Sequence, residues 1–291
     1  MTAARERVKA LSFWRETVDP QPLGGGITNV NFSVTHQGGK FVVRVGDDIP
    51  VHQVMRFNER AASEAAYRAG ISPEVVHGEP GILVIRFIEG KTFGPEDVCE
   101  ARNLERIVPL IRRVHEEMPK QIRGPALVFW VFHVLRDYAH TLREVGSRHT
   151  PRLNALLETA HELERDVGPI RMVYGHNDLL PANFLDDGQR LWLIDWDYAG
   201  FNSPLFDLAN LASNNELAPE QERYVLETYF GAPPTPELQL QYSAMKCASL
   251  LRETMWSMVS EIHSKLDFDY KAYTADYLAR FERTLATHRQ R

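Results

Sequence analysis

A short polar stretch between apolar runs constrains this chain more than any other feature. Residues 174–198 read YGHNDLLPANFLDDGQRLWLIDWDY. Asp178 stands five residues before Asn183, and Asp195 follows twelve residues later, at the end of an apolar run. A carboxylate in that position is costly unless it meets a partner or a metal. One carboxylate to orient a hydroxyl, and a second with an amide oxygen to hold magnesium, are the groups that phosphoryl transfer requires.

Taken singly, these residues carry little information. Histidine, asparagine and aspartate are common in turns, where their side chains form local hydrogen bonds, and Asp195 alone suits a turn at a strand end. Turns alone explain the combination less well, because three unrelated turn residues would have to fall by chance at the spacing of Asp178, Asn183 and Asp195. The sequence therefore predicts Asp178 as a catalytic base, with Asn183 and Asp195 as magnesium ligands.

Periodicity divides the chain into a strand-rich and a helix-rich part. The first part is predicted to hold helices over 11–22 and 52–69 and strands over 30–34, 41–45 and 82–88. In the second part, helical spacing recurs over 96–117, 126–145, 150–166, 218–230 and 236–263, with short strands at 171–174 and 191–194. We therefore expect an α+β fold with a small lobe of residues 1–88 and a helical lobe of residues 89–291. A cleft between two lobes is a favoured place for a ligand.

Two features of the first lobe suit phosphate binding. Residues 24–29 read GGGITN; glycines let backbone N–H groups approach phosphate oxygens, although a triple glycine is also a common flexible turn. Arg44 lies in the second strand after this loop, where strand alternation would equally let it face solvent, but a kinase keeps its phosphate-binding cation in such a strand. Glu59 is the best candidate to pair with Arg44, and Glu64 is the second.

Composition narrows the classes of partner. The formal net charge of −6 argues against a nucleic-acid binder, and 44% hydrophobic with 25% charged residues is ordinary for a soluble globular protein. The two cysteines have no metal or disulfide spacing, which suits a reducing cytosol. No secretory signal opens the sequence, and the apolar runs are too short to span a membrane. We expect a cytoplasmic protein without nucleic-acid partner or stable membrane association, and a homodimer remains open.

Together these motifs resemble those of the choline/ethanolamine kinases, within the aminoglycoside-phosphotransferase group of protein-kinase-like folds. The resemblance spans roughly residues 20–285 and is most specific over 194–200, IDWDYAG, which leads to FDLAN at 206–210. The wider group usually carries H-G-D at its catalytic loop. The H-N-D at 176–178, and arginine rather than lysine at position 44, are similar to the choline-kinase branch.

The resemblance implies a bilobed protein-kinase-like fold, an N-terminal lobe that binds nucleotide, and ATP with Mg²⁺ as cofactors. Asp178 would be the catalytic base, Asn183 and Asp195 would hold magnesium, and Asp207 would brace the catalytic loop. The residues implied at the ATP site are Gly25, Gly26, Thr28, Asn29, Arg44 and Glu59, with Phe87, Ile88 and Glu89 as the hinge between the lobes.

The substrate expectation rests on the C-terminal region. Choline kinases have a similar run there, in which aromatic side chains enclose a quaternary ammonium, a contact worth about 1–2 kcal/mol when desolvated. Trp256 and Tyr273 fall on two cage positions, although Trp256 also lies in an apolar helix stripe that suits core packing. Eukaryotic choline kinases tend to have a second tryptophan where Glu253 stands and a glutamate near Asn214. Glu253, or Glu216 beside Asn214, could accept hydrogen bonds from an amine.

We therefore expect an ATP- and magnesium-dependent kinase that phosphorylates the hydroxyl of a small amino alcohol, with choline ahead of ethanolamine. A phosphotransferase for an aminoglycoside, thiamine or a sugar is the nearest alternative, and an aminoglycoside site would need an acidic cleft. A nucleotide-binding pseudokinase would have to explain why all three catalytic residues are present. Phosphatases and nucleases usually show more clustered carboxylates or histidines.

Overall fold

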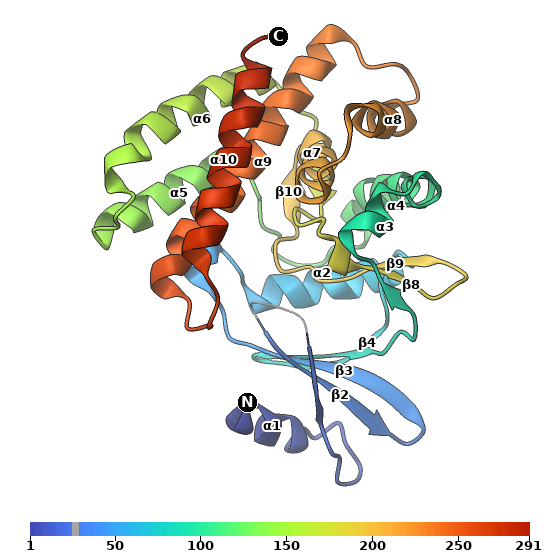
Figure 1. Cartoon of the computed structure of the whole chain (residues 1–291). Coiled ribbons are helices and arrows are strands. Elements are labelled where there is room, and N and C mark those ends of the chain that lie inside the picture. Colours follow the sequence, from blue (N-terminus) through green and yellow to red (C-terminus); the bar gives the residue numbers. More distant parts are fainter. Residues whose placement is uncertain (25–28) are drawn as a thin grey trace.

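A five-stranded antiparallel sheet forms the small lobe of the computed structural model, which describes residues 1–24 and 29–291 (Figure 1). The strand order is β1-β2-β3-β5-β4. Helix α2 (Arg56–Arg68) lies between this sheet and the larger lobe (Figure 1). The strands are β1 (Gln21–Leu23), β2 (Val30–His36), β3 (Gly39–Val45), β4 (Val75–Glu79) and β5 (Ile82–Arg86).

The helix predicted over 11–22 is wrong. Helix α1 (Thr2–Lys9) ends before that segment, which continues through turns into β1. Leu11, Trp14 and Val18 have helical spacing, but they bury their side chains on the sheet from an irregular backbone. The indole nitrogen of Trp14 donates to the carbonyl oxygen of Val8 at 2.7 Å, which holds this segment against α1.

The larger lobe is mostly helical, as expected. Its helices are α3 (Pro95–Cys99), α4 (Ala101–Gln121), α5 (Val131–Glu144), α6 (Leu153–Val167), α7 (Pro204–Asn215), α8 (Pro219–Phe230), α9 (Pro236–His263) and α10 (Tyr270–His288). The α+β, two-lobed prediction is confirmed, but the sequence did not predict α7 and α10. The antiparallel pair α9 and α10 runs along one side of the lobe, beside α5 and α6 (Figure 1).

Short strands and 3-10 turns surround the polar stretch of residues 174–198. Strand β7 (Val173–Gly175) pairs with β10 (Gly200–Asn202), and β8 (Phe184–Asp186) pairs with both β6 (Lys91–Thr92) and β9 (Leu191–Leu193). The remaining turns are η1 (Pro50–His52), η2 (Thr150–Arg152) and η3 (Pro181–Asn183). Residues 176–178 follow β7 and residues 194–196 follow β9, and the two segments meet where His176 Nε2 lies 2.9 Å from the carbonyl oxygen of Ile194.

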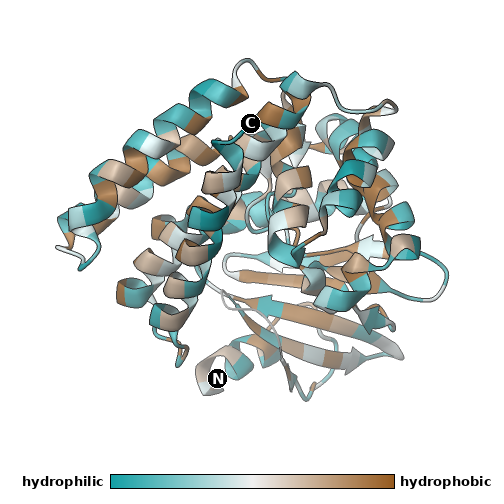
Figure 2. Ribbon diagram, turned by 45° about the horizontal axis from the view of Figure 1, so that its top comes forward, coloured by the Kyte–Doolittle hydropathy of each residue, from teal (hydrophilic) through white to brown (hydrophobic). Residues whose placement is uncertain are grey.

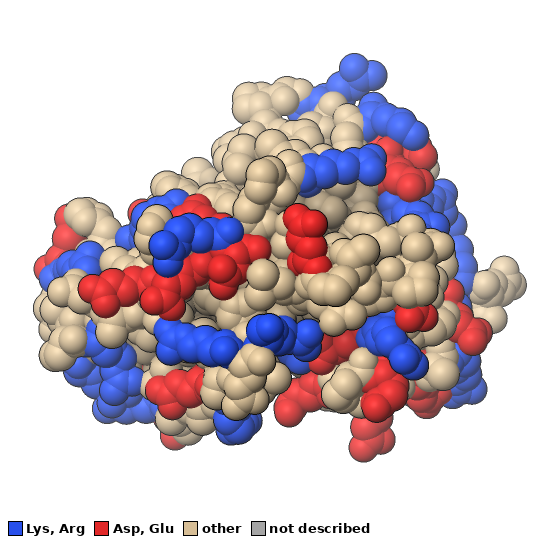
Figure 3. Space-filling model, turned by 90° about the horizontal axis from the view of Figure 1, so that it is seen from above, with Lys and Arg blue, Asp and Glu red and all other residues tan. Residues whose placement is uncertain are grey.

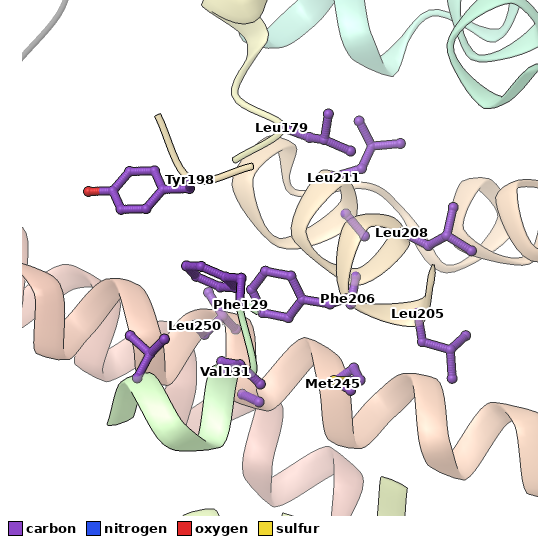
Figure 4. Close-up of a cluster of buried hydrophobic side chains, with 14 of the residues drawn as sticks. Phe129, Val131, Leu179, Tyr198, Leu205, Phe206, Leu208, Leu211, Met245 and Leu250 are labelled. Carbon is purple, nitrogen blue, oxygen red and sulfur yellow. The ribbon is translucent and has the colours of Figure 1, made fainter. Parts of the chain in front are cut away.

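Two hydrophobic cores support this arrangement. The smaller lies between the sheet and the N-terminal segment, and the larger fills the helical lobe (Figure 2). Ala62, Ala65 and Ala66 of α2 belong to the larger core, since their small side chains let α2 approach closely. Figure 4 shows part of this core, in which Phe129 lies between the rings of Tyr198 and Phe206, at 6.0 and 5.4 Å. The division at residue 88 remains a prediction.

The surface has no strongly one-signed face in the view of Figure 3, where acidic and basic side chains are intermixed. Within the described ranges 1–24 and 29–291, none of the helices combines the length and apolar character that a membrane crossing requires.

A buried carboxylate joins α9 to its neighbours. Glu261 accepts hydrogen bonds from Arg148 at 2.8 and 2.9 Å and from Thr274 of α10 at 2.8 Å, and its Oε1 lies 3.0 Å from His149 Nε2. Burial raises the pKa of Glu261, but these hydrogen bonds outweigh it and lower the pKa to about 2. A carboxyl whose folded pKa is depressed stabilises the fold above its unfolded pKa, and this contribution is lost as the pH falls through the folded value.

We therefore predict that Glu261→Gln lowers the free energy of unfolding at pH 7 by about 1–2 kcal/mol, because hydrogen bonds to a charged group are lost. Urea unfolding at a series of pH values measures the difference from wild type, which should shrink from about pH 4.5 towards pH 2. Glu144→Gln is the control, since Glu144 is exposed and its carboxylate lies 3.2 Å from the exposed His140. A Glu261 effect as small as the control, or one that does not depend on pH, would count against this assignment.

Candidate active site

Asp207 at the first turn of α7 fixes the loop that carries Asp178. Its two carboxylate oxygens accept the backbone N–H groups of His176 at 2.8 Å and Asn177 at 2.7 Å, and His115 Nε2 lies 2.9 Å from Oδ2. Burial raises the pKa of Asp207, but the hydrogen bond and charge of His115 outweigh it and leave the pKa below its ordinary value. Asp207 therefore makes the hydrogen bonds to the catalytic loop that the resemblance implied.

The histidine and asparagine before Asp178 tie the loop to the segment after β9. His176 Nε2 lies 2.9 Å from the carbonyl oxygen of Ile194. Asn177 donates through Nδ2 to the carbonyl oxygens of Tyr198 at 3.0 Å and Gly200 at 3.2 Å. Asn177 adopts a φ of 64°, a left-handed conformation that asparagine tolerates better than most residues. A glycine would supply the conformation but not the side-chain bonds.

The two predicted magnesium ligands lie on neighbouring segments. The carbonyl oxygen of Asn183 accepts the backbone N–H of Ile194 at 3.0 Å, which places Asn183 across the hairpin from the residue before Asp195. The Asn183 amide nitrogen donates to the backbone carbonyl of Asp178 at 2.8 Å, so the amide oxygen is the group left for a cation. Asp195 has a φ of 68°, a strained conformation of the kind that gathers at functional sites.

These oxygen donors fit magnesium, which binds few protein groups and takes further oxygens from phosphates and water. Among residues 1–24 and 29–291, no group of three or more His, Cys, Asp or Glu side chains could hold a metal by itself.

A buried cluster of charges joins the two lobes beside Asp195. Arg44 Nε lies 2.7 Å from Glu59 Oε1, and Arg44 Nη2 lies 2.8 Å from Asp195 and 3.3 Å from Asp197. Arg56 Nη1 adds contacts to Glu59 at 2.7 Å and Asp197 at 3.0 Å. The predicted pairing of Arg44 with Glu59 is thus present.

The alternative partner, Glu64, contacts Arg60 instead. Two of the three carboxylates in the cluster, Asp195 and Asp197, have pKa values shifted in opposite directions. Burial raises the pKa of Asp195, but the charge and hydrogen bond of Arg44 outweigh it and the pKa stays below its ordinary value. Burial, and then the negative charge of Asp195, raise the pKa of Asp197 to about 7.

The structure describes only some of the remaining residues of the expected ATP site. Gly25, Gly26 and Thr28 lie outside the described residues. Asn29 Nδ2 lies 3.5 Å from Asp197 Oδ2, so this end of the loop reaches the charge cluster.

The expected hinge follows β5. Phe87 already donates its N–H to the carbonyl oxygen of Lys40 at 3.0 Å, and the Lys40 ammonium lies 2.7 Å from Glu89. The N–H of Phe87 is therefore already used within the sheet.

A second set of contacts leads from Asp178 into α9 and α10. Arg252 Nη1 lies 3.8 Å from Asp178 Oδ1 and 2.6 Å from Glu253 Oε2. The hydroxyl of Tyr273 donates to Glu253 Oε1 at 2.9 Å. Burial raises the pKa of Asp178 to about 8, although the positive charge of Arg252 lowers it. A cation bound nearby would favour the ionised form of this carboxyl further.

Trp256 belongs to the same region rather than to a remote part of the core. Its indole nitrogen donates to the hydroxyl of Tyr198 at 2.9 Å, and its ring centre lies 6.4 Å from Tyr273 and 6.0 Å from Tyr270. The Arg252 guanidinium lies 4.4 Å from the centre of the Tyr198 ring. The residues predicted for the substrate, Glu253, Trp256 and Tyr273, therefore form one connected group that reaches Asp178 through Arg252.

The other proposed acceptor of an amine hydrogen bond is not part of this group. The side chain of Glu216 is 74% exposed and faces Arg280 at 3.8 Å. Asn214 donates to Asn210 within α7 at 3.2 Å. Glu253 is thus the carboxylate that lies with Trp256 and Tyr273.

Sequence reasoning missed the roles of Arg56, Asp197, Tyr198 and Arg252. The sequence held a signal for Asp197 and Tyr198, which directly follow Asp195 within a motif that was already singled out. A charged Arg252 inside the apolar run of α9 was a weaker signal. Arg56 had none, because its partners come from distant parts of the chain.

Comparison with known proteins gives this geometry a family. The family model for choline/ethanolamine kinase matches residues 21–226, which include the charge cluster and the catalytic loop. The chain belongs to the choline/ethanolamine kinase family. Members that it resembles include the protein LicA of Haemophilus influenzae, 29% identical over 84% of this chain and 75% of that protein. A probable ethanolamine kinase of Arabidopsis thaliana is 26% identical over 86% of this chain and 75% of that protein.

Solved structures agree with this assignment. A choline/ethanolamine kinase family protein from Mesorhizobium loti has a TM-score of 0.79 and 26% identity, and the match covers 98% of this chain and 94% of that one. The choline kinase LicA from Streptococcus pneumoniae has a TM-score of 0.80 at 22% identity, covering 98% of each chain. The aminoglycoside phosphotransferase APH(4)-Ia has a TM-score of 0.68 at 18% identity, covering 93% of this chain and 95% of that one. The protein-kinase-like fold expected from the sequence is confirmed.

Proposed function

We propose that this kinase transfers the γ-phosphoryl group of ATP to the hydroxyl of a small amino alcohol, choline ahead of ethanolamine. The observation that carries the proposal is the position of Asp178. On one side it contacts Asn183 of the magnesium pair, and on the other it faces Arg252 and, through it, the group of Glu253, Trp256 and Tyr273. A carboxylate between the proposed magnesium ligands and a group of aromatic rings with a second carboxylate suits a hydroxyl that carries an ammonium two carbons away.

The nucleotide side is proposed to use the charge cluster. Arg44, held by Glu59, would contact ATP phosphates together with Asn29 and the loop residues Gly25, Gly26 and Thr28. Backbone groups of Ile88 and Glu89, with Phe87 beside them, would face the adenine. Asn183 and Asp195 would hold Mg²⁺, which neutralises phosphate charge as the phosphoryl group moves.

On the acceptor side, Asp178 would orient the hydroxyl and accept its proton late in the transfer, because the transition state is loose. Aromatic faces of Trp256, Tyr198 and Tyr273 offer their π electrons to a cationic head group. The Glu253 carboxylate supplies the opposite charge. Positioning of the two reactants, rather than strong base chemistry, supplies most of the rate enhancement in this arrangement.

An acceptor screen tests the proposal. ATP consumption is measured with choline, ethanolamine, thiamine and a set of aminoglycosides, each with and without Mg²⁺. We expect choline and ethanolamine to stimulate turnover well above the rate without acceptor, and only when Mg²⁺ is present. Stimulation by thiamine or an aminoglycoside alone would replace the proposed substrate, and no stimulation by any acceptor would support a pseudokinase. We further propose a cytoplasmic location, where ATP and amino alcohols occur together.

A further inference from the structure

Arg252 occupies an unusual position between the two acidic groups of the acceptor side. Its guanidinium is 2% exposed and lies 2.6 Å from Glu253 and 3.8 Å from Asp178. The rings of Tyr198 and Phe129 lie 4.4 and 5.5 Å from the guanidinium carbon. Its Nε and Nη2 are buried without a hydrogen-bond partner among the described residues. The arginine is therefore held by charge and by aromatic faces, while three of its five N–H donors have no hydrogen-bond partner among the described residues.

Stability alone does not account for this arrangement. A buried ion pair gives little net stabilisation, because desolvation of both charges offsets their attraction, and an apolar residue of similar size often does as well. The neighbours of Arg252 along α9, Leu251 and Met255, are fully buried apolar residues. A leucine or methionine at 252 would continue this packing without the cost of burying a charge.

The chemistry of the acceptor suggests what the charge does. An amino alcohol has two ends, a cationic ammonium and a neutral hydroxyl. Asp178 and Glu253 are both carboxylates, so an ammonium would be attracted to either one. If it paired with Asp178, the hydroxyl would point away from the phosphate and the complex would be unproductive. A fixed positive charge beside Asp178 removes this ambiguity, because it repels an ammonium from the catalytic carboxylate but not a hydroxyl.

We propose that Arg252 is a positioning residue that orients the acceptor, keeping its ammonium away from Asp178 so that the hydroxyl occupies that site. The inference rests on the proposed function, since it concerns how a cationic alcohol binds.

The test is steady-state kinetics of Arg252→Met, which keeps the length of the side chain but removes its charge. Unproductive binding lowers kcat and KM for the same acceptor together, because substrate is held tightly in the wrong orientation. We expect both constants for choline to fall by at least about tenfold, since a charge contact near 4 Å is worth more than that factor inside a protein. KM for ATP should stay within about twofold of wild type.

An uncharged acceptor separates this role from a structural one. 3,3-Dimethylbutan-1-ol has the shape of choline without its charge, so it has no ammonium to misplace. Its kcat should therefore fall much less than the kcat for choline in Arg252→Met, because only the effect of the Arg252 charge on Asp178 remains. Arg252→Lys keeps the positive charge and should recover most of the kcat for choline, although it lacks the planar fork of arginine. Arg112→Met is the control, because Arg112 is also partly buried over an aromatic ring, that of Tyr229, and its guanidinium donates to the carbonyl oxygens of Thr228 and Tyr229.

Three results would overturn the inference. They are a rise in the KM for choline in Arg252→Met, an equal loss of kcat with the uncharged alcohol, or no recovery by Arg252→Lys. If Arg252→Met does not fold, Arg252→Gln removes the charge in a shorter polar side chain and carries the same predictions. If wild type phosphorylates neither choline nor ethanolamine, the proposed function fails and this inference with it. If wild type phosphorylates them and the variants show any of the three results, only the inference fails.

Discussion

Asp178→Asn is expected to lower kcat for the amino alcohol by about 10²–10⁴-fold, the range associated with the loss of a positioned acid or base. Asparagine has nearly the same shape as aspartate, and the loop around it is held by bonds to the backbone of His176 and Asn177 rather than to Asp178. The variant should therefore fold and keep its ATP affinity. Initial rates at saturating ATP and acceptor give kcat, and calorimetric titration with nucleotide gives affinity.

Asp166→Asn is a suitable control for this experiment. Asp166 lies on α6, its side chain is 42% exposed, and it contacts His288 of α10. It should show wild-type kcat. Turnover by Asp178→Asn within about threefold of wild type would rule out the base assignment, because a positioned general base typically contributes about 10²–10⁴-fold. A loss of nucleotide affinity equal to the loss of kcat would instead indicate a collapsed site.

Asp195→Ala is expected to remove the dependence of ATP binding on Mg²⁺ and to abolish measurable turnover. Groups that only support a metal ligand are already worth about 10–100-fold in metal affinity, so the loss of a direct ligand should exceed that range. The fold should survive, because Arg44 retains its contacts to Glu59 and Asp197. Nucleotide titrations with and without Mg²⁺ measure the effect.

The control for this variant is Asp187→Asn, at the turn of the same hairpin, where the carboxylate binds Trp192 and local backbone groups. Its ATP affinity should respond to Mg²⁺ as in wild type. If Mg²⁺ still strengthens ATP binding to Asp195→Ala by the wild-type factor, Asp195 does not hold the metal. Asn183 and other groups would then have to be tested as the principal ligands.

The catalytic side of this site was largely predictable from sequence, because its residues lie close together along the chain. Asp178, Asn183 and Asp195 occupy two loops joined by short strands, so their spacing alone limits where the side chains can meet. The partnership of Arg44 with Glu59 was also predicted, since a strand and the helix after it can have few relative placements.

The acceptor side was less predictable, and the reason is physical. The role of Arg252 depends on its contacts with Asp178 and Tyr198, which are more than fifty residues away in the sequence. Helical periodicity cannot show which face of α9 packs against which loop. The helix expected over 11–22 failed for a related reason. Apolar residues with helical spacing can also be buried by an irregular segment when a sheet lies beneath it, and Pro20 and Pro22 remove backbone donors at its end.

The most direct test of the account is to identify the product. Wild-type protein is incubated with ATP, Mg²⁺ and choline or ethanolamine, and the acceptor is examined by mass spectrometry and ³¹P NMR while ADP is measured in parallel. We predict a phosphate monoester of the amino alcohol, formed in equal amount to ADP and formed at least about a hundredfold more slowly by Asp178→Asn. ADP without any phosphorylated choline or ethanolamine would contradict the central claim.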